Sequence, residues 1–350
     1  MAYSTILKPT DYFDTKLYVG NGGAAGGTQT ITGVGFQPDW TWIKNRATQG
    51  HHVLTDAVRG ANKQINTNRN NAELSLTTQL TAFTSDGFSV GAGTEVNGNG
   101  NNMVSWNWKA NGQGSSNTDG TINSTYTSAN TTSGFSIVSY TGNGSAGATV
   151  GHGLGQTPGV FITKRLSGTS SWGMYHQSTG AGGFMELNST NALQSNAAYF
   201  NNTAPTSSVF SIGTDSINNT SGSTYIAYCF ADIQGYSKFG SYVGNGNADG
   251  SFIFCGFKPA FVMIKNATQS GDRWIIHDNK RDVDNGCNHR LFPDGDIAES
   301  TSTTSLDFLS NGFKQRTDAG TSNTNGQTYI FMAFAEAPLV SSNGVAATAR

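Results

Sequence analysis

The chain has 350 residues, of which 12% are charged, with a formal net charge of -2, 45 glycines and 7 prolines. A nearly neutral chain lacks the basic surface that binding to a phosphate backbone requires, so nucleic acid is excluded as a partner. The 11% of aromatic residues supply the burial that disordered chains lack, so we expect a folded, turn-rich β protein.

One motif occurs three times and divides the chain into repeats. The sequence Tyr-x-Gly-Asn-Gly begins at Tyr18, Tyr140 and Tyr242. Each copy is followed by a Gly-x-x-Pro segment, by a strand with a lysine, and by further apolar strands. Repeats of about 100 residues are whole domains, because stacked arrays have a period of about 20 to 50 residues. We predict an all-β fold of three tandem antiparallel β-sandwich modules of jelly-roll or lectin-like type.

The predicted boundaries follow the composition. Module 1 covers 1–110 with an N-terminal anchor, and the polar segment 111–133 is expected to be a flexible linker. Module 2 covers 134–234 and module 3 covers 235–340, followed by a C-terminal tail, 341–350. Modules 2 and 3 nearly adjoin, so we expect them to dock at a fixed angle, while module 1 is hinged and separable by limited proteolysis.

Local patterns predict the main strands and turns. Trp40, Trp42 and Lys44 alternate along one face, which is typical of a half-buried strand. Asn-Gly in the repeated motif predicts a tight hairpin turn of the primed type. A lysine recurs near the end of the equivalent strand, where we expect it at a sheet edge or rim that resists aggregation. These lysines are Lys44, Lys164 and Lys265.

The cysteines and the apolar segments indicate where the chain is made. Cys229, Cys255 and Cys287 form no even framework, so no disulfides are expected. Residues 1–16 lack the apolar core of a signal peptide, and no segment approaches the roughly 20 apolar residues of a membrane span. We therefore expect synthesis in a reducing cytosol and no membrane insertion.

Five residues are the candidate ligand-binding positions. They are aromatic, acidic or imidazole side chains that follow the lysine-containing strand: Asp56, Trp172, His176, Trp274 and Asp278. Exposed aromatic rings beside acidic groups would hold a sugar by stacking and hydrogen bonding.

An arginine and a glutamate accompany two of these acids. The sets are Asp56, Arg59 and Glu73 in module 1, and Asp278, Arg281 and Glu299 in module 3. Because a carboxylate and a guanidinium pair bidentately, we favour a salt bridge that fixes a long inter-strand connection. A ligand-binding loop is the alternative interpretation.

Other motifs lack the context that their chemistry needs. Gly142 to Gly147 has dinucleotide-binding spacing, but a strand follows it, so no cofactor is expected. The acids and histidines of 277–296 miss calcium-loop and zinc-finger spacing, which leaves a hard-cation site between loops as an open alternative. No catalytic constellation repeats between copies, so we expect that the protein is not an enzyme.

Longer segments resemble a known family over the whole chain. They are Met1-Ala-Tyr-Ser-Thr-Ile, Gly35-Phe-Gln-Pro-Asp-Trp-Thr-Trp-Ile-Lys-Asn45, the segment 236–246 and Met332-Ala-Phe-Ala-Glu-Ala-Pro338. They are similar to repeat proteins of marine tailed bacteriophages, including cyanophages, that are virion structural components.

The resemblance implies a virion protein assembled in the host cytoplasm, most simply a tail-fibre or appendage component for host attachment. Its expected partners are other virion subunits and a host surface glycan. Closed symmetry in such attachments predicts a homo-oligomer, a trimer above all. A capsid decoration protein and a carbohydrate-binding module outside a virion are the alternatives.

Overall fold

The computed structural model describes residues 4–23, 27–301, 305–340 and 344–348. In these ranges the fold is almost entirely β, and the strands pair in an antiparallel manner. The prediction of an all-β fold is confirmed. No helix within them is long and apolar enough to cross a membrane.

Three large sheets share one strand order. The sheet of module 1 runs β1 (Phe13–Val19), β9 (Asn102–Trp108), β3 (Trp40–Asn45), β4 (Val53–Asp56), β5 (Lys63–Asn66), β6 (Leu74–Ser75). That of module 2 runs β10 (Ser115–Asn117), β11 (Ser124–Asn130), β12 (Phe135–Thr141), β19 (Thr224–Phe230), β14 (Val160–Arg165), β15 (Trp172–His176), β16 (Gly183–Glu186), β17 (Gln194–Ser195). That of module 3 runs β20 (Ser237–Val243), β26 (Thr328–Pro338), β22 (Phe257–Asn266), β23 (Ile275–Asp278). In each, the last strand of the module lies between the first strand and the lysine-containing strand.

A smaller sheet covers the outer face of each large one. These sheets are β2 (Gln29–Ile31), β8 (Gly87–Val90) and β7 (Leu80–Thr84); β13 (Ala148–Gly151) and β18 (Val209–Ile212); β21 (Phe252–Phe254), β25 (Gly312–Gln315) and β24 (Leu306–Leu309). The helical elements are η1 (Pro9–Asp11), α1 (Thr94–Asn97) and α2 (Ala197–Phe200). Separate apolar clusters around Phe88, Phe210 and Phe313 fill the space between the layers, so each module is a small sandwich.

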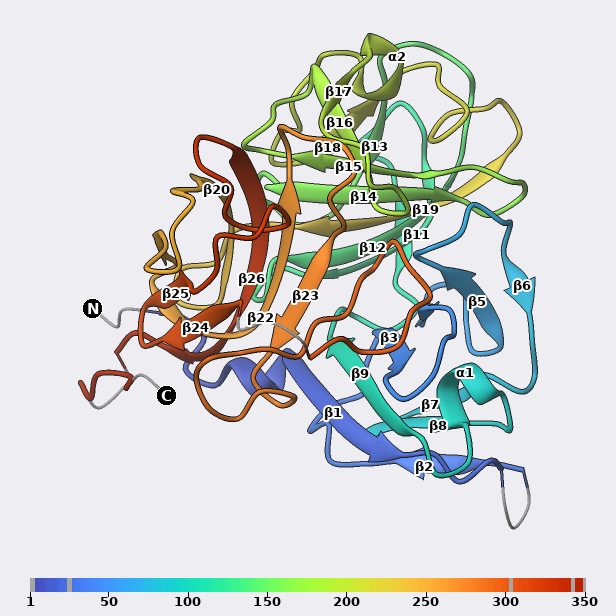
Figure 1. The fold of residues 1–350 in the computed structure, drawn as a ribbon. Coiled ribbons are helices and arrows are strands. Elements are labelled where there is room, and N and C mark those ends of the chain that lie inside the picture. The colour runs from blue at the N-terminus through green and yellow to red at the C-terminus, as the bar shows by residue number, and fades with distance from the viewer. Residues whose placement is uncertain (1–3, 24–26, 302–304, 341–343, 349–350) are drawn as a thin grey trace.

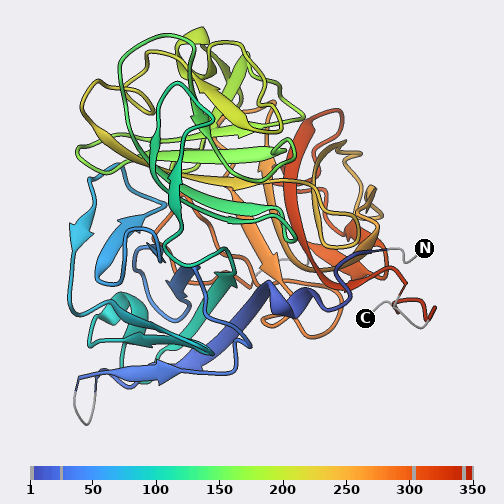
Figure 2. The same ribbon diagram turned by 180° about the vertical axis from the view of Figure 1, so that it is seen from behind.

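The inner faces of the three large sheets meet in one shared core (Figure 1). Trp108, Phe230 and Phe334 occupy equivalent places on the last strands and form a triangle at its centre. Their ring centroids lie 6.5 Å (Trp108 to Phe230), 5.5 Å (Trp108 to Phe334) and 5.8 Å (Phe230 to Phe334) apart. The modules therefore form a closed ring with pseudo-threefold symmetry, also visible from behind (Figure 2). Burial of apolar surface holds it together.

The shared core changes the environment of strand β3. Trp40 and Trp42 contribute to the shared core, whereas Ile43 contributes to the separate cluster of module 1, and all six residues of the strand are buried. The prediction of a half-buried strand is wrong, because the ring covers the face that an isolated sandwich would leave in water.

The segment 111–133 is not a linker. Its strands β10 and β11 extend the sheet of module 2, and β11 pairs with β12 from Tyr126↔Ser139 to Asn130↔Phe135. Hydroxyl groups satisfy the backbone where apolar side chains are scarce, as when the N–H of Asn111 donates to Ser128 Oγ at 2.8 Å. The prediction of a hinged module 1 is also wrong, since module 1 shares its core with the other two.

The predicted anchor and tail are partly described. Residues 1–3 lie outside the described part, but Ile6 is buried in the shared core and the Ser4 hydroxyl donates to the carbonyl of Gln234 at 2.8 Å. The N-terminal segment is thus packed at the junction of modules 2 and 3. In the tail, residues 341–343 and 349–350 are outside the described ranges, and Ala346 bridges to Val340.

The repeated Tyr-x-Gly-Asn-Gly motif packs each first strand against the loop before the last strand. The hydroxyls of Tyr18, Tyr140 and Tyr242 donate to carbonyls of this connection at 2.6, 2.8 and 2.6 Å, the first of them to Val96 in α1. A Cβ at Gly20 would lie 2.3 Å from the carbonyl oxygen of Gly98, so a side chain cannot fit there. The hairpin prediction is wrong, because β1 pairs with β9 rather than with the strand that follows it.

Candidate functional site

Equivalent positions of the modules meet at three interfaces, which we call 1–2, 2–3 and 3–1 after the modules they join. The last strand of one module approaches the end of β4, β15 or β23 in another. Asp56, His176 and Asp278 are the final residues of these three strands. Three of the five candidate residues therefore occupy one pseudo-symmetric position.

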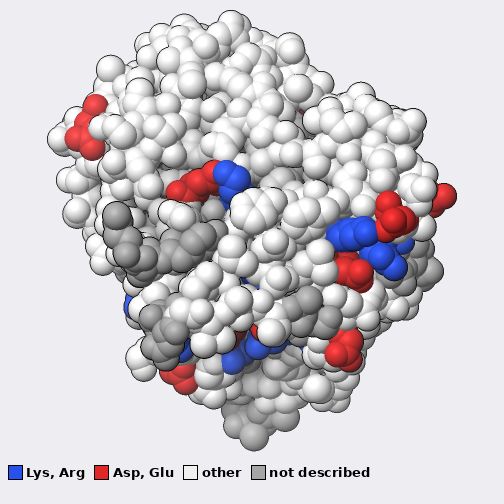
Figure 3. Space-filling view, turned by 90° about the vertical axis from the view of Figure 1, so that its left-hand side faces the viewer, with Lys and Arg blue, Asp and Glu red and all other residues white. Residues whose placement is uncertain are grey.

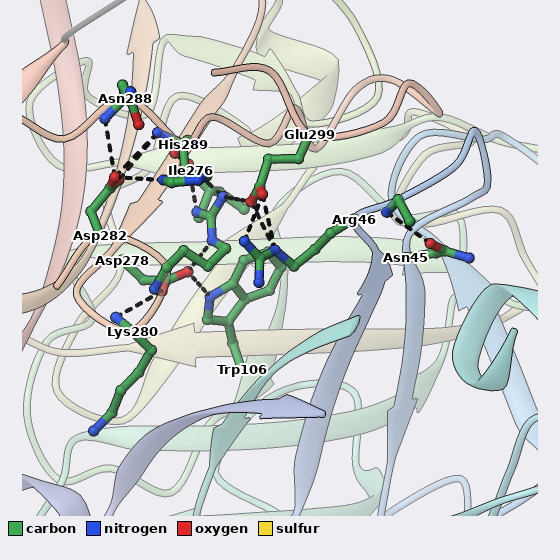
Figure 4. Close-up of polar contacts among 12 residues, drawn as sticks. Asn45, Arg46, Trp106, Ile276, Asp278, Lys280, Asp282, Asn288, His289 and Glu299 are labelled. Carbon is green, nitrogen blue, oxygen red and sulfur yellow. Dashed lines mark hydrogen bonds and ion pairs between the residues drawn. The ribbon is translucent and has the colours of Figure 1, made fainter. Parts of the chain in front are cut away.

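At interface 3–1, Asp278 of module 3 binds module 1. Its Oδ2 accepts from the indole N–H of Trp106 at 2.9 Å and from Nε of Arg281 at 2.6 Å (Figure 4). Its Oδ1 accepts from the backbone N–H groups of Lys280 and Arg281. The Arg281 guanidinium also lies over the Trp106 ring, 5.7 Å from its centroid. The carboxylate is thus fully engaged in holding two modules together.

A second carboxylate completes this network. Glu299 accepts from Nη1 of Arg281 at 2.9 Å, and from Arg46 of module 1 at 3.0 Å (Nε) and 2.7 Å (Nη2) (Figure 4). Burial raises the pKa of Glu299, but the hydrogen bonds and charges of Arg46 and Arg281 outweigh it and leave the pKa lowered. Glu299 therefore stays ionised between two guanidinium groups.

Interface 1–2 repeats the same design with a different donor. Asp56 Oδ2 accepts from the hydroxyl of Tyr228 of module 2 at 2.7 Å and from Nε of Arg59 at 2.6 Å. Arg59 reaches Glu73 at 3.2 Å, and Lys63 lies 3.4 Å from the same carboxylate. Both sets of residues form the salt bridges that the sequence suggested. In addition, each aspartate accepts a hydrogen bond from a side chain of the neighbouring module.

Interface 2–3 has a histidine in place of the acid. His176 Nε2 lies 3.2 Å from the carbonyl of Phe331, and its Nδ1 accepts from the backbone N–H of Ser178 at 3.1 Å. These partners fit the neutral ring with the proton on Nε2. Burial lowers the pKa of His176 to about 4, against the opposing effects of the Phe331 carbonyl and of Asp232.

The two remaining candidates, Trp172 and Trp274, also join modules. Trp172 Nε1 donates to the carbonyl of Asn66 in module 1 at 2.9 Å, and Trp274 Nε1 donates to the carbonyl of Glu186 in module 2 at 3.1 Å. Asn66 and Glu186 end β5 and β16, which are equivalent strands. The indoles therefore make the same contact at successive interfaces.

All five candidate residues are at most 1% exposed: Asp56, Trp172, His176, Trp274 and Asp278. Their rings and carboxylates contact protein atoms on every side, so none presents a face on which a sugar could stack in this fold. The structure brings them together as interface contacts rather than as a binding groove.

The repeated lysines are buried, not at a sheet edge. Each ammonium group donates to a carbonyl of another module: Lys44 to Asp296 at 3.3 Å, Lys164 to Asn70 at 3.2 Å, Lys265 to Thr190 at 3.1 Å. Desolvation by burial lowers the pKa of each to about 8. The edge prediction fails because the ring places this strand end at an interface.

The acids of the module 3 loops bind separate protein groups. Asp282 accepts from the ring of His289 at 2.7 Å, and Asp294 accepts from the backbone of Trp274 at 3.0 Å and from Arg273 at 3.2 Å. Burial raises the pKa of Asp294 to about 6. Within the described residues, no three or more His, Cys, Asp or Glu side chains gather as metal ligands would.

Sequence reasoning missed the partners from the neighbouring modules. Trp106, Tyr228 and Arg46 were not recognised as ligands of the acids, because a single sequence does not show which copies face one another. The recurrence of aromatic residues at equivalent places on β9 and β19 was the available signal.

The comparisons assign the chain to a family. It belongs to the family described as a domain of unknown function, DUF7483, whose model matches residues 8–338. No curated protein and no solved structure matches it. Because the match extends over all three modules, the family corresponds to the whole ring rather than to one repeat.

Proposed function

We propose that this DUF7483 chain is a structural subunit of a bacteriophage particle, a rigid body on a tail fibre or similar appendage that takes part in host attachment. The observation that carries the proposal is the closure of three sandwiches into one ring around a common aromatic core. Such a body has few internal degrees of freedom, which suits a part that must hold its shape outside a cell.

The use of the reactive side chains supports a structural role. Several reactive side chains donate or accept across module interfaces: Asp56, Asp278, Glu299, Arg46, His176 and the three lysines. Groups saturated in this way stiffen the fold, and proton transfer or nucleophilic attack would require them to be released. The resemblance to virion proteins of marine tailed phages supplies the setting.

The surface is consistent with this role. The view onto modules 2 and 3 shows mostly uncharged side chains with a few small clusters of charge (Figure 3). A neutral polar surface suits contact with uncharged partners such as other virion subunits or a host glycan.

The ring changes how such a subunit would be attached. A scheme in which module 1 anchors and modules 2 and 3 project requires a hinge, and the shared core leaves none between them. We propose instead that the whole ring is presented as one unit, most simply as a trimer of chains. Native mass spectrometry at micromolar concentration tests the trimer, and a clean monomer would exclude autonomous assembly.

The location of the protein tests the function directly. Antibodies against the purified chain should label the tails of intact particles of the phage that encodes it, and mass spectrometry should find the chain in purified particles. Antibody label distributed over the capsid would indicate that the protein is a capsid decoration protein instead. Absence of the chain from purified particles would overturn the proposal.

A further inference from the structure

The three interfaces can be compared at one position. The backbone N–H of Glu73, Leu193 and Glu299 donates to a carbonyl of the adjacent module, and the distance is 3.0 Å in each case. The residues that supply those carbonyls are Leu166, Ala267 and Arg46. The same backbone hydrogen bond therefore forms at all three interfaces, but the side chains at its two ends differ. They are Leu166 and Glu73 at 1–2, Ala267 and Leu193 at 2–3, and Arg46 and Glu299 at 3–1.

At interface 3–1 the acid is covered. Arg46 binds Glu299 with two nitrogens, and the side chains of this pair are only 15% and 9% exposed. A hollow of about 220 Å³ beside Arg46 is lined by Leu17, Tyr18 and Val19, and Glu299 is not part of its lining. Arg46 therefore lies between Glu299 and this hollow.

At interface 1–2 the equivalent hollow reaches the acid. Leu166 occupies the position of Arg46 and has no polar group that could pair with the acid. Glu73 and Arg59 therefore form part of the lining of a hollow of about 270 Å³. Glu73 keeps only longer ion pairs, 3.2 Å to Arg59 and 3.4 Å to Lys63, where Glu299 has contacts of 2.7 and 2.9 Å.

The walls of this hollow suit a planar cation. Thr125 and Tyr126 of the β11 strand line it together with Ser139 and Thr141 of β12. Hydroxyl and carbonyl oxygens accept hydrogen bonds from guanidinium N–H groups, and a tyrosine ring attracts a cation to its face. Interface 3–1 shows that one glutamate of this type binds two guanidinium groups at once.

We propose that the hollow at interface 1–2 binds the guanidinium group of an arginine side chain supplied by another polypeptide. The incoming group takes the place that Arg46 fills at interface 3–1 and pairs with Glu73, while Arg59 keeps its contact with Asp56. It displaces Lys63, whose pair with Glu73 is long at 3.4 Å and whose side chain is 40% exposed. This site is independent of whether the chain acts in a virion.

Titration with N-acetyl-arginine amide, followed by NMR of the full chain, tests the site. We expect saturable shifts with a dissociation constant of about 1 to 10 mM, because the ion pair with Glu73 is joined by contacts with the Tyr126 ring and with the hydroxyl groups of the hollow. The neutral isostere N-acetyl-citrulline amide should bind at least about tenfold more weakly, since it lacks the charge.

Two variants separate binding from folding. Glu73→Gln should weaken binding by about tenfold or more. Leu166→Arg should recreate the pair of interface 3–1, so it should abolish binding and raise the unfolding temperature. Absence of saturable shifts up to about 50 mM ligand would overturn the proposal, as would unchanged binding in a folded Leu166→Arg protein.

Discussion

The indole N–H of Trp106 in module 1 donates to the carboxylate of Asp278 in module 3, 172 residues away, at 2.9 Å. Tyr228 in module 2 makes the matching contact with Asp56 in module 1, again across 172 residues, at 2.7 Å. These two contacts run in the same rotational sense, and at the third interface the ring of His176 bonds to the carbonyl of Phe331 instead.

Removing the charge from either acid should loosen the ring. Asp56→Asn and Asp278→Asn each remove one of the two carboxylates that pair with a buried arginine and leave only Glu73 or Glu299. Because loss of one member of a buried pair costs about 3 to 5 kcal/mol, we expect a loss near the lower end of that range. Urea unfolding followed by circular dichroism measures the change. Asp249→Asn is the control, because Asp249 pairs with Lys314 at the surface and its side chain is 78% exposed. Equal stability of the buried and exposed variants would contradict the structural role.

The three buried lysines should make the protein more stable in mild alkali. The pKa of each is about 8 in the folded chain, against an ordinary value of 10.5. The unfolded chain therefore binds more protons between these values, and the free energy of unfolding should rise by about 2 kcal/mol per lysine between pH 7.5 and 9.5.

Above about pH 10 the trend should reverse. Burial raises the pKa of tyrosines such as Tyr140 and Tyr242, so these keep their protons in the folded chain while the unfolded chain releases them. Lys164→Met should remove about a third of the rise in the free energy of unfolding that we expect between pH 7.5 and 9.5. A slope identical to that of the unsubstituted chain would show that Lys164 is not the titrating group.

Lowering the pH should destabilise interface 2–3, because His176 is buried there in its neutral form. Its pKa of about 4 in the folded chain lies below the ordinary 6.5, so the unfolded chain takes up the proton first as the pH falls. Stability should fall by about 2 kcal/mol from this group between pH 6.5 and 4.5. His176→Gln, which keeps a donor for Phe331, should show a smaller loss over this range in denaturation experiments. The opposite ranking would exclude this histidine as the source.

The ring should unfold as one unit. Phe334→Ala removes one corner of the central triangle and should cost about 3 to 5 kcal/mol, because truncation of a buried aromatic leaves a cavity. Tryptophan fluorescence reports on all three modules, because Trp172 lies in module 2, Trp274 in module 3 and the other four tryptophans in module 1. If the ring unfolds in one step, fluorescence and circular dichroism should give the same midpoint. Two separated transitions, or early proteolysis within 111–133, would show that module 1 folds on its own.

Repeats and strands could be predicted from the sequence, but their packing could not. The three copies, the all-β class and the burial of Trp106 and Trp108 follow from alignment of the repeats, because each position recurs with similar chemistry. The same alignment is silent about which faces of the modules are exposed. The sequence pattern predicts that Trp172 and Trp274 stack on a sugar, whereas both indoles are buried between modules.

The polar segment 111–133 shows a second limit. Its composition is that of a linker, and apolar content is the usual signal for order. Here Ser128 and the backbone supply the hydrogen bonds, while an existing sheet edge supplies the template. A strand that joins a ready-made edge needs little apolar surface of its own, so composition underestimated its order.

The closure of the ring also bears on synthesis at the ribosome. Trp108 emerges 226 residues before Phe334, by subtraction of their positions. At about 5 to 20 residues per second, roughly 10 to 45 seconds pass before the last member of the triangle arrives. During that interval modules 1 and 2 expose to solvent the tryptophan and phenylalanine side chains that the shared core later covers, so unfinished chains have an apolar face through which they can associate with one another.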